Sequence, residues 1–188
     1  KARMLLLTAP LPQSLSLIES SELGISSSAL EPLHSVKYDP CLALIATLEA
    51  PALPVGSGIH LRPSEGLAGI FDQSRKGLAT ERATFVVHAS PENSRALWDS
   101  PEEVIRDRLW SEALPFLESL HGPLLKPERA LHRWRYCEPQ NPLERLFFSW
   151  NRVVFAGDGF GKASLSGAFH SGEAAANFIA DSQRTSGA

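Results

Sequence analysis

The chain has 188 residues, a formal net charge of -3 and a sequence pI near 6.1. This slightly acidic balance argues against nucleic acid or an anionic membrane surface as a partner. Hydrophobic residues make up 43% and charged residues 21%, which is ordinary for a globular protein, and no apolar run approaches the roughly 20 residues of a membrane span. We therefore expect a cytoplasmic protein with one substantial core, or with one domain and part of another.

The first part of the chain predicts two strands around a short helix. The run from Arg3 to Thr8 is apolar and ends before Pro10, as expected of a buried strand in a parallel sheet. Prolines at positions 10 and 12 introduce an amphipathic helix over residues 14–20. Residues 36–49 again have the pattern of a strand, with a break at Pro40.

The middle of the chain predicts a meander of short strands followed by two helices. Residues 59–62 and 67–72 flank a turn and indicate a hairpin, and residues 84–89 form a further β-branched strand. Ser90 is a suitable cap for a short helix over 91–99. A second helix is expected to have Ser100 as its cap and Pro101 as its first residue, and to reach about position 120, with Pro115 kinking or splitting it.

The last strand of this proposed sheet is expected over residues 128–136. Its alternation places Ala130, His132, Trp134 and Tyr136 on one face and Arg129, Leu131, Arg133 and Arg135 on the other. Residues 141–150 are expected to be a loop. The chain then forms an apolar strand at 153–156, a turn at Gly157-Asp158-Gly159, a small-residue loop at 161–166, and a helix from Gly167 to about position 179.

This carboxyl-terminal strand, turn and helix can bring a backbone close to a ligand. Glycines remove side chains, and the first N–H groups of a helix have no partner within the helix, so they favour an anion or a polarised carbonyl. Asp158 at the end of the strand could accept hydrogen bonds from sugar hydroxyls. The alternative interpretation is that these glycines serve only tight packing.

The whole segment resembles the flavin-binding segment of FAD-dependent amine oxidases, most closely the renalase-like branch. The matching positions are Gly157-Asp158, Gly167-Ala168 and Ser171-Gly172. Further similarities are the Thr-Ala-Pro-x-Pro-Gln run at 8–13, the strand that begins near Tyr38, and the Trp-Arg-Tyr strand at 134–136.

The resemblance implies FAD as the cofactor. Asp158 would contact the ribityl or pyrophosphate part of FAD, and the backbone of residues 166–168 would face the pyrimidine edge of the flavin, where the helix dipole stabilises negative charge. The cofactor-binding residues would be Gly157, Asp158, Gly159, Ser166, Gly167 and Ala168. No residue is assigned a catalytic role, and the histidines and cysteines have no metal-ligand spacing.

The resemblance also implies a substrate pocket lined by His132, Trp134, Arg135 and Tyr136. Trp134 and Tyr136 could equally be core aromatic residues beneath a helix. Arg135 could pair with a substrate phosphate or with a surface carboxylate such as Glu138. Cys41 and Cys137 are expected to be reduced, buried thiols.

These expectations combine into an α+β fold: a mostly antiparallel substrate-domain sheet covered by helices, with the carboxyl-terminal strand and helix of an FAD-binding Rossmann-like domain. Residues 1–33 would end the FAD-binding domain, 34–150 would form the substrate domain, and 151–188 would return to the FAD-binding domain. The sequence has no Gly-x-Gly-x-x-Gly turn, which enzymes of this type use for the pyrophosphate. We therefore expect a fragment that is inactive without an amino-terminal half, which could be a separate partner chain.

The implied function is hydride transfer from a small reduced substrate, such as a dihydronicotinamide or an amine, to flavin, followed by reoxidation by dioxygen. Other branches of the family desaturate carotenoid-like lipids, which the lack of long apolar stretches disfavours. The alternative is a non-catalytic domain or degenerate homologue that binds no flavin and serves as an interaction module. An NAD-dependent dehydrogenase fits less well, because the strand-Gly-Asp-loop-helix pattern is a feature of FAD binding in the amine oxidase group.

Overall fold

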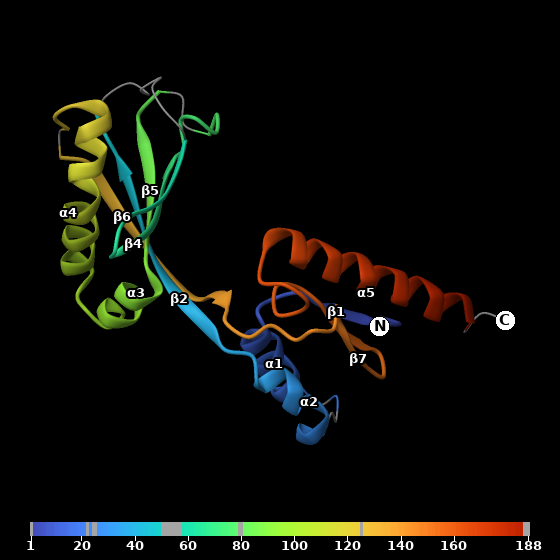
Figure 1. Cartoon of the computed structure of the whole chain (residues 1–188). Coiled ribbons are helices and arrows are strands. Elements are labelled where there is room, and N and C mark those ends of the chain that lie inside the picture. The colour runs from blue at the N-terminus through green and yellow to red at the C-terminus, as the bar shows by residue number, and fades with distance from the viewer. Residues whose placement is uncertain are drawn as a thin grey trace. The chain divides into compact units, whose positions relative to one another are not determined.

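The structure is a computed structural model that describes residues 2–21, 23, 26–49, 58–78, 81–124 and 126–185. The chain divides into two units (Figure 1). Unit 1 consists of residues 1–39 and 136–188, and unit 2 of residues 40–135. Residues 34–39 and 136–150, assigned to the substrate domain from the sequence, thus belong to the unit that contains both ends of the chain.

Unit 1 is built on a three-stranded sheet with the order β1-β8-β7. Strands β1 (Leu5–Leu7) and β8 (Val153–Phe155) are parallel, and β7 (Phe148–Trp150) is antiparallel to β8. The prediction that residues 141–150 form a loop is therefore wrong at the carboxyl-terminal end of this range, where β7 lies. The missed strand belongs to a tight hairpin in which Asn151 has a φ of 52°, a conformation that asparagine tolerates and that suits a two-residue turn.

Helices cover both faces of this sheet. Val153 and Phe155 pack with residues of α1 (Leu11–Glu19) and α2 (Ser27–His34), while Val154 and Ala156 pack with residues of α5 (Leu165–Thr185). Figure 1 shows these helices on opposite sides of the sheet. Helix α5 continues beyond the expected end near position 179. Strand β1 is less buried than expected, because it lies at the sheet edge, where Leu5 and Leu6 are 40% and 41% exposed.

Unit 2 contains most of a five-stranded sheet with the order β3-β4-β5-β2-β6. Its strands are β2 (Tyr38–Thr47), β3 (Ile59–Ser64), β4 (Leu67–Asp72), β5 (Thr84–Ala89) and β6 (Glu128–Pro139). The pairs β3/β4, β4/β5 and β5/β2 are antiparallel. The hairpin expected from the sequence is confirmed, and the chain has the α+β fold class.

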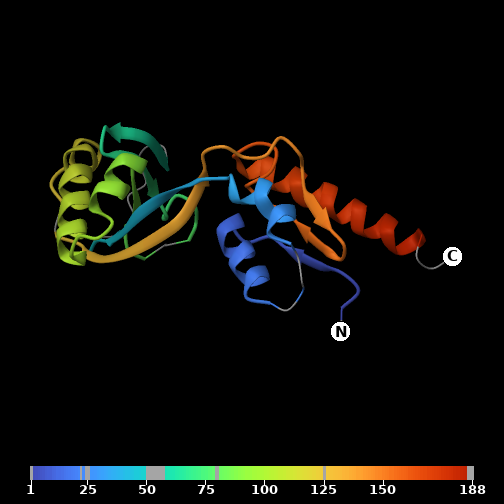
Figure 2. The same ribbon diagram turned by 90° about the horizontal axis from the view of Figure 1, so that it is seen from below.

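Two helices accompany this sheet, and α4 packs on one face of it (Figures 1 and 2). Helix α3 (Pro91–Leu97) begins as predicted, because the Ser90 hydroxyl accepts a hydrogen bond from the Asn93 N–H at 3.3 Å. Helix α4 (Glu102–His121) has Pro101 at its cap position, so the expected serine cap at Ser100 is wrong. Pro115 does not split α4, because it lies on the exposed side, where water can reach the carbonyl that it leaves unbonded.

The core of unit 2 lies between α4 and the sheet. Alternate residues of β2 and β5 point toward the helix, and their partners on α4 recur every three to four residues. The principal members are Leu42, Leu44, Ala46, Phe85, Val87, Ile105, Leu109, Ala113 and Leu117. In the described part of the chain, no helix is long and apolar enough to cross a membrane.

Candidate functional site

The candidate cofactor site lies in unit 1, where the parallel strands β1 and β8 end. Residues 8–10 follow β1 and lead into α1, and residues 157–159 follow β8 and lead through a loop into α5. In open α/β sheets, ligands bind at the carboxyl ends of the strands, close to helix amino termini. Asp158 is the acidic side chain of this region and is half-buried.

The turn after β8 contacts both the segment that follows β1 and helix α5. Gly157 has a φ of 131°, and a Cβ atom there would come within 3.3 Å of the Thr8 carbonyl oxygen. Its N–H donates to the hydroxyl of Ser171 at 2.8 Å, and Ser171 is fully buried on α5. Gly157 thus serves the close approach of β1, β8 and α5, which supports a packing role for this glycine.

Asp158 is held by a residue that sequence analysis did not assign to the site. The Tyr38 hydroxyl donates to Oδ1 of Asp158 at 2.9 Å and accepts the N–H of Leu11, the first residue of α1, at 3.4 Å. In the described part of the chain, no hydrogen bond is found for Oδ2 of Asp158. One carboxylate oxygen is therefore engaged within the protein and the other can accept a hydrogen bond from a ligand.

The start of α5 offers polar groups and exposed apolar side chains. The Ser164 hydroxyl accepts the N–H of Gly167 at 3.0 Å, and its carbonyl accepts the N–H of Ala168 at 2.9 Å. Within the described residues, the N–H of Ser166 has no hydrogen-bond acceptor. Ser166 is exposed, Ala168 is partly exposed and Gly167 is buried. Ser166 and Ala168 are accordingly accessible to a ligand, whereas Gly167 lies behind them.

The four residues expected in a substrate pocket lie in different surroundings. His132 and Trp134 are exposed neighbours on β6, with ring centroids 4.5 Å apart. Arg135 lies over the ring of Trp98 at 5.2 Å, on the side of the sheet that α4 covers. Tyr136 belongs to unit 1 and makes an edge contact with Tyr38 at 6.1 Å.

The structure decides some of the alternatives that the sequence left open for Trp134 and Arg135, and it tests the expected burial of the two cysteines. Trp134 is 52% exposed and is not a core aromatic residue. Arg135 makes a cation–π contact with Trp98, an interaction that the sequence does not reveal. Cys41 is buried as expected, but Cys137 is exposed, because β6 presents it to solvent. Sequence alternation correctly separated Arg135 from His132 and Trp134.

The face of the five-stranded sheet opposite α4, here called the open face, carries a row of apolar side chains. A cross-strand row runs over four strands, with Ile45 paired to Val86, Val86 to Phe71, and Phe71 to Ile59. Ile45 and Ile59 are 38% and 51% exposed. Leu131 packs toward α4, so the alternation of β6 places His132 and Trp134 on the open face. An antiparallel sheet usually presents polar residues on an uncovered face, so these side chains mark a surface suited to an apolar or aromatic group.

His88 is the titratable residue of β5 on this face, with its ring 4.8 Å from that of Phe71. Burial lowers the pKa of His88 below its usual value, and the charge of Lys76 lowers it further. The folded chain therefore binds fewer protons than the unfolded chain as the pH falls through about 6.5. We expect the free energy of unfolding to decrease between pH 7 and pH 5, and to decrease less in His88→Gln. Identical pH profiles in urea titrations would contradict this assignment.

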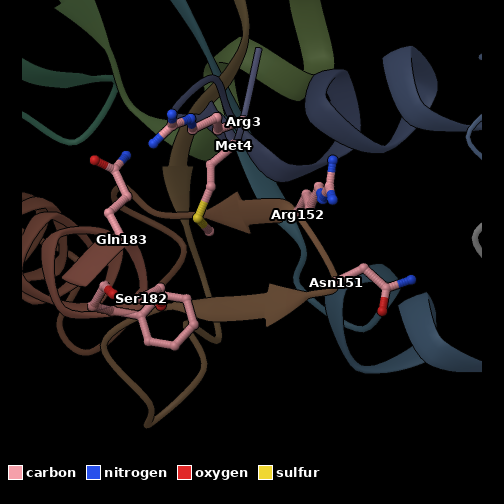
Figure 3. A pocket seen from close by; sticks show the side chains of 7 residues that line it. Arg3, Met4, Asn151, Arg152, Ser182 and Gln183 are labelled. Carbon is pink, nitrogen blue, oxygen red and sulfur yellow. Dashed lines mark hydrogen bonds between the residues drawn. The ribbon is translucent and has the colours of Figure 1, made fainter. Parts of the chain in front are cut away.

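Two surface cavities of unit 1 lie at the other end of the strands. They measure about 440 and 510 Å³ and share Asn151 and Arg152, at the amino-terminal end of β8. In the first cavity, the side chains of Arg3 and Arg152 extend in different directions around Met4 (Figure 3), so they do not converge on one ligand. Among the described residues, no group of three or more His, Cys, Asp or Glu side chains could hold a metal ion. The candidate site is therefore the Asp158 end of the sheet.

No protein-family model and no curated protein matches this chain. Among solved structures, the chain is similar to the crystal structure of the PF1083 protein from Pyrococcus furiosus, with a TM-score of 0.54 and 16% sequence identity. The similarity covers 88% of this chain and 38% of that protein. This chain thus spans well under half of the length of the similar protein, and at this identity the similarity shows a shared fold.

Proposed function

We propose that this chain is the substrate domain and carboxyl-terminal flavin-binding segment of a renalase-like, FAD-dependent oxidoreductase. The observation that supports it best is Asp158, a half-buried carboxylate beyond two parallel strands, with one oxygen held by Tyr38 and the other available. Bound flavin would supply the chemistry, accepting a hydride from a small reduced substrate and being reoxidised by dioxygen. The residues of this chain would bind and orient the cofactor.

The groups around Asp158 fit the middle of a flavin cofactor. A carboxylate repels a phosphate and accepts hydrogen bonds from hydroxyls, so Asp158 favours contact with the ribityl chain over contact with the pyrophosphate. At the start of α5, the N–H of Ser166 and the positive end of the helix dipole suit the electron-rich pyrimidine edge. Gly159 and Gly167 are buried. Because glycine has no side chain, these two residues would shape the site through their backbone alone.

Binding of the adenosine and pyrophosphate parts of FAD would require residues in addition to those around Asp158. The sequence has no Gly-x-Gly-x-x-Gly turn, so we propose that a separate amino-terminal half supplies it. The carboxylate of Asp158 does not substitute for the backbone N–H groups that bind a pyrophosphate. The adenosine and pyrophosphate contacts would then come from that second part, whereas the residues of this chain would bind the flavin ring and the ribityl chain by themselves.

The substrate surface that we propose is the open face of the sheet. Its row Ile45–Val86–Phe71–Ile59 and the neighbouring rings of His132 and Trp134 suit a planar or apolar substrate. Arg135 is turned toward Trp98 and is not part of this surface. A dihydronicotinamide ring and an aromatic amine both fit such a surface.

Flavin binding tests the proposal directly. We expect the purified chain, titrated with FAD, to change the absorption of the flavin near about 450 nm. Asp158→Ala should weaken binding by about tenfold or more, because it removes hydrogen bonds to a charged acceptor. Asp181→Ala, which removes an exposed carboxylate near the other end of α5, is the matched control and should bind like the unchanged protein.

The absence of any spectral change with FAD would contradict the proposed function. An equal loss in both variants would show that the effect is not specific to the Asp158 side chain. Intact mass of a yellow preparation would also reveal a second polypeptide, if one carries part of the cofactor site.

A second candidate function is an interaction module that binds no flavin. The observation in its favour is the open face, whose cross-strand row of four apolar residues is only partly covered and would pack well against another protein. A colourless preparation in which Ile45→Asp abolishes association with a co-purifying protein would favour this function over the first.

A further inference from the structure

Tyr38 links the amino terminus of α1 to Asp158. Its hydroxyl accepts the Leu11 N–H at 3.4 Å and donates to Oδ1 of Asp158 at 2.9 Å. Tyr38 and Asp158 are 120 residues apart in sequence, and both belong to unit 1. Helix α1 has no side-chain cap at Pro10, so the Tyr38 hydroxyl serves one of its otherwise unsatisfied N–H groups.

The surroundings of the Tyr38 hydroxyl leave it little freedom to turn away. A Cβ atom at Gly159 would lie 2.8 Å from this hydroxyl and 2.8 Å from Cδ1 of Leu11. The edge of the Tyr136 ring contacts the Tyr38 ring at a centroid distance of 6.1 Å. Burial and the neighbouring Asp158 charge raise the pKa of Tyr38 well above its usual value, so the phenol keeps its proton and remains a donor.

We propose that Tyr38 is a positioning residue, which holds Oδ1 of Asp158 so that Oδ2 is presented in one orientation to a hydroxyl of the ligand. The inference rests on the proposed flavin function and specifies the ligand group as a neutral polyol. A free carboxylate samples several rotamers and can turn either oxygen toward a ligand. A carboxylate with one oxygen engaged offers a single acceptor position and pays less entropy on binding.

The neutral polyol of a flavin is its ribityl chain, and two flavins separate its contribution. Riboflavin carries the ribityl chain without a phosphate, and lumiflavin has a methyl group in its place. We expect the purified chain to bind riboflavin more tightly than lumiflavin, measured by quenching of flavin fluorescence. Tyr38→Phe should reduce riboflavin affinity by about tenfold and leave lumiflavin affinity unchanged, because only the ribityl contact depends on Asp158.

Lumiflavin is the internal control for damage to the fold. Tyr38→Phe also leaves the Leu11 N–H without its acceptor. Damage to the fold would lower the affinity for both flavins alike, whereas loss of the positioned carboxylate lowers the affinity for riboflavin alone. A double-mutant cycle gives a second readout. In an Asp158→Ala background, Tyr38→Phe should have no further effect on riboflavin binding, because the positioned group is already absent.

The possible outcomes separate the inference from the function on which it rests. Binding of neither flavin by the unchanged chain overturns the proposed function and this inference with it. Preferential binding of riboflavin that Tyr38→Phe does not alter supports the function and overturns the positioning role. An effect of Tyr38→Phe that persists in the Asp158→Ala background also overturns it, because Tyr38 would then act by another route.

Discussion

Gly167→Ala should destabilise the chain by about 1–3 kcal/mol, the cost of forcing extra atoms into a packed site. A Cβ atom on Gly167 would lie 1.9 Å from the carbonyl oxygen of Lys162 and 2.8 Å from its carbonyl carbon. Both are backbone atoms, so relief requires the loop before α5 to move. Ser164 caps this same turn through the Gly167 N–H, and the cap should be lost with that movement.

Gly172 in the same helix provides the matched control. A Cβ atom there meets nothing within 4 Å, so Gly172→Ala should stabilise α5 by up to about 1 kcal/mol through helix propensity alone. Urea unfolding followed by circular dichroism measures both changes. Equal effects at the two positions would show that the Lys162 carbonyl does not constrain the start of α5.

This contact changes how variants of Gly167 are to be interpreted. The resemblance places the backbone of residues 166–168 at the pyrimidine edge of the flavin, so it implies that a side chain at position 167 would occupy the space that this edge needs. In the structure, the space is taken by the Lys162 backbone, so a Gly167 variant that fails to bind flavin reports on the loop as well as on the ligand. Asp158 and Tyr38 give cleaner tests, because their side chains can be shortened without a collision.

The sequence predicts best those elements whose boundaries are marked by residues with strong local preferences. The hairpin of β3 and β4, strand β5 and the start of α3 were all recognisable, because turn residues or a capping serine adjoin short apolar runs. Strand β7 was missed, because it has only three residues and it pairs with β8 through a hairpin whose turn contains Asn151. The cap of α4 was misplaced by one residue because Ser100 and Pro101 are both suitable for a helix start.

The candidate site was only partly predictable for a different reason. Asp158 follows an apolar strand and a glycine, which is a local signal. Tyr38 contacts it across 120 residues of sequence, and no local pattern reveals such a contact. Arg135 was grouped with His132 and Trp134 through family resemblance, although the period of a strand already placed it on the other face. Periodicity was the better guide to side-chain direction.

Phe85→Ala should cost about 3–5 kcal/mol of unfolding free energy, because Phe85 is 1% exposed in the core between α4 and the sheet. The adjacent strand offers a matched control in Phe71, which points to the open face and is half-buried beside His88. Phe71→Ala removes the same atoms from a surface with few covering groups, so it should cost about 1 kcal/mol or less. Urea titrations can use the fluorescence of Trp110, which lies in the Phe85 core.

The difference between these two variants also measures how well the open face is covered in solution. Side-chain truncation costs most where surrounding atoms cannot refill the space. A large cost for Phe71→Ala would therefore show that another molecule or segment packs on the row Ile45–Val86–Phe71–Ile59, and would favour the interaction module. A small cost leaves the row available to a substrate, as the flavoenzyme proposal requires. A small cost for Phe85→Ala, in contrast, would contradict the packing of α4 on the sheet.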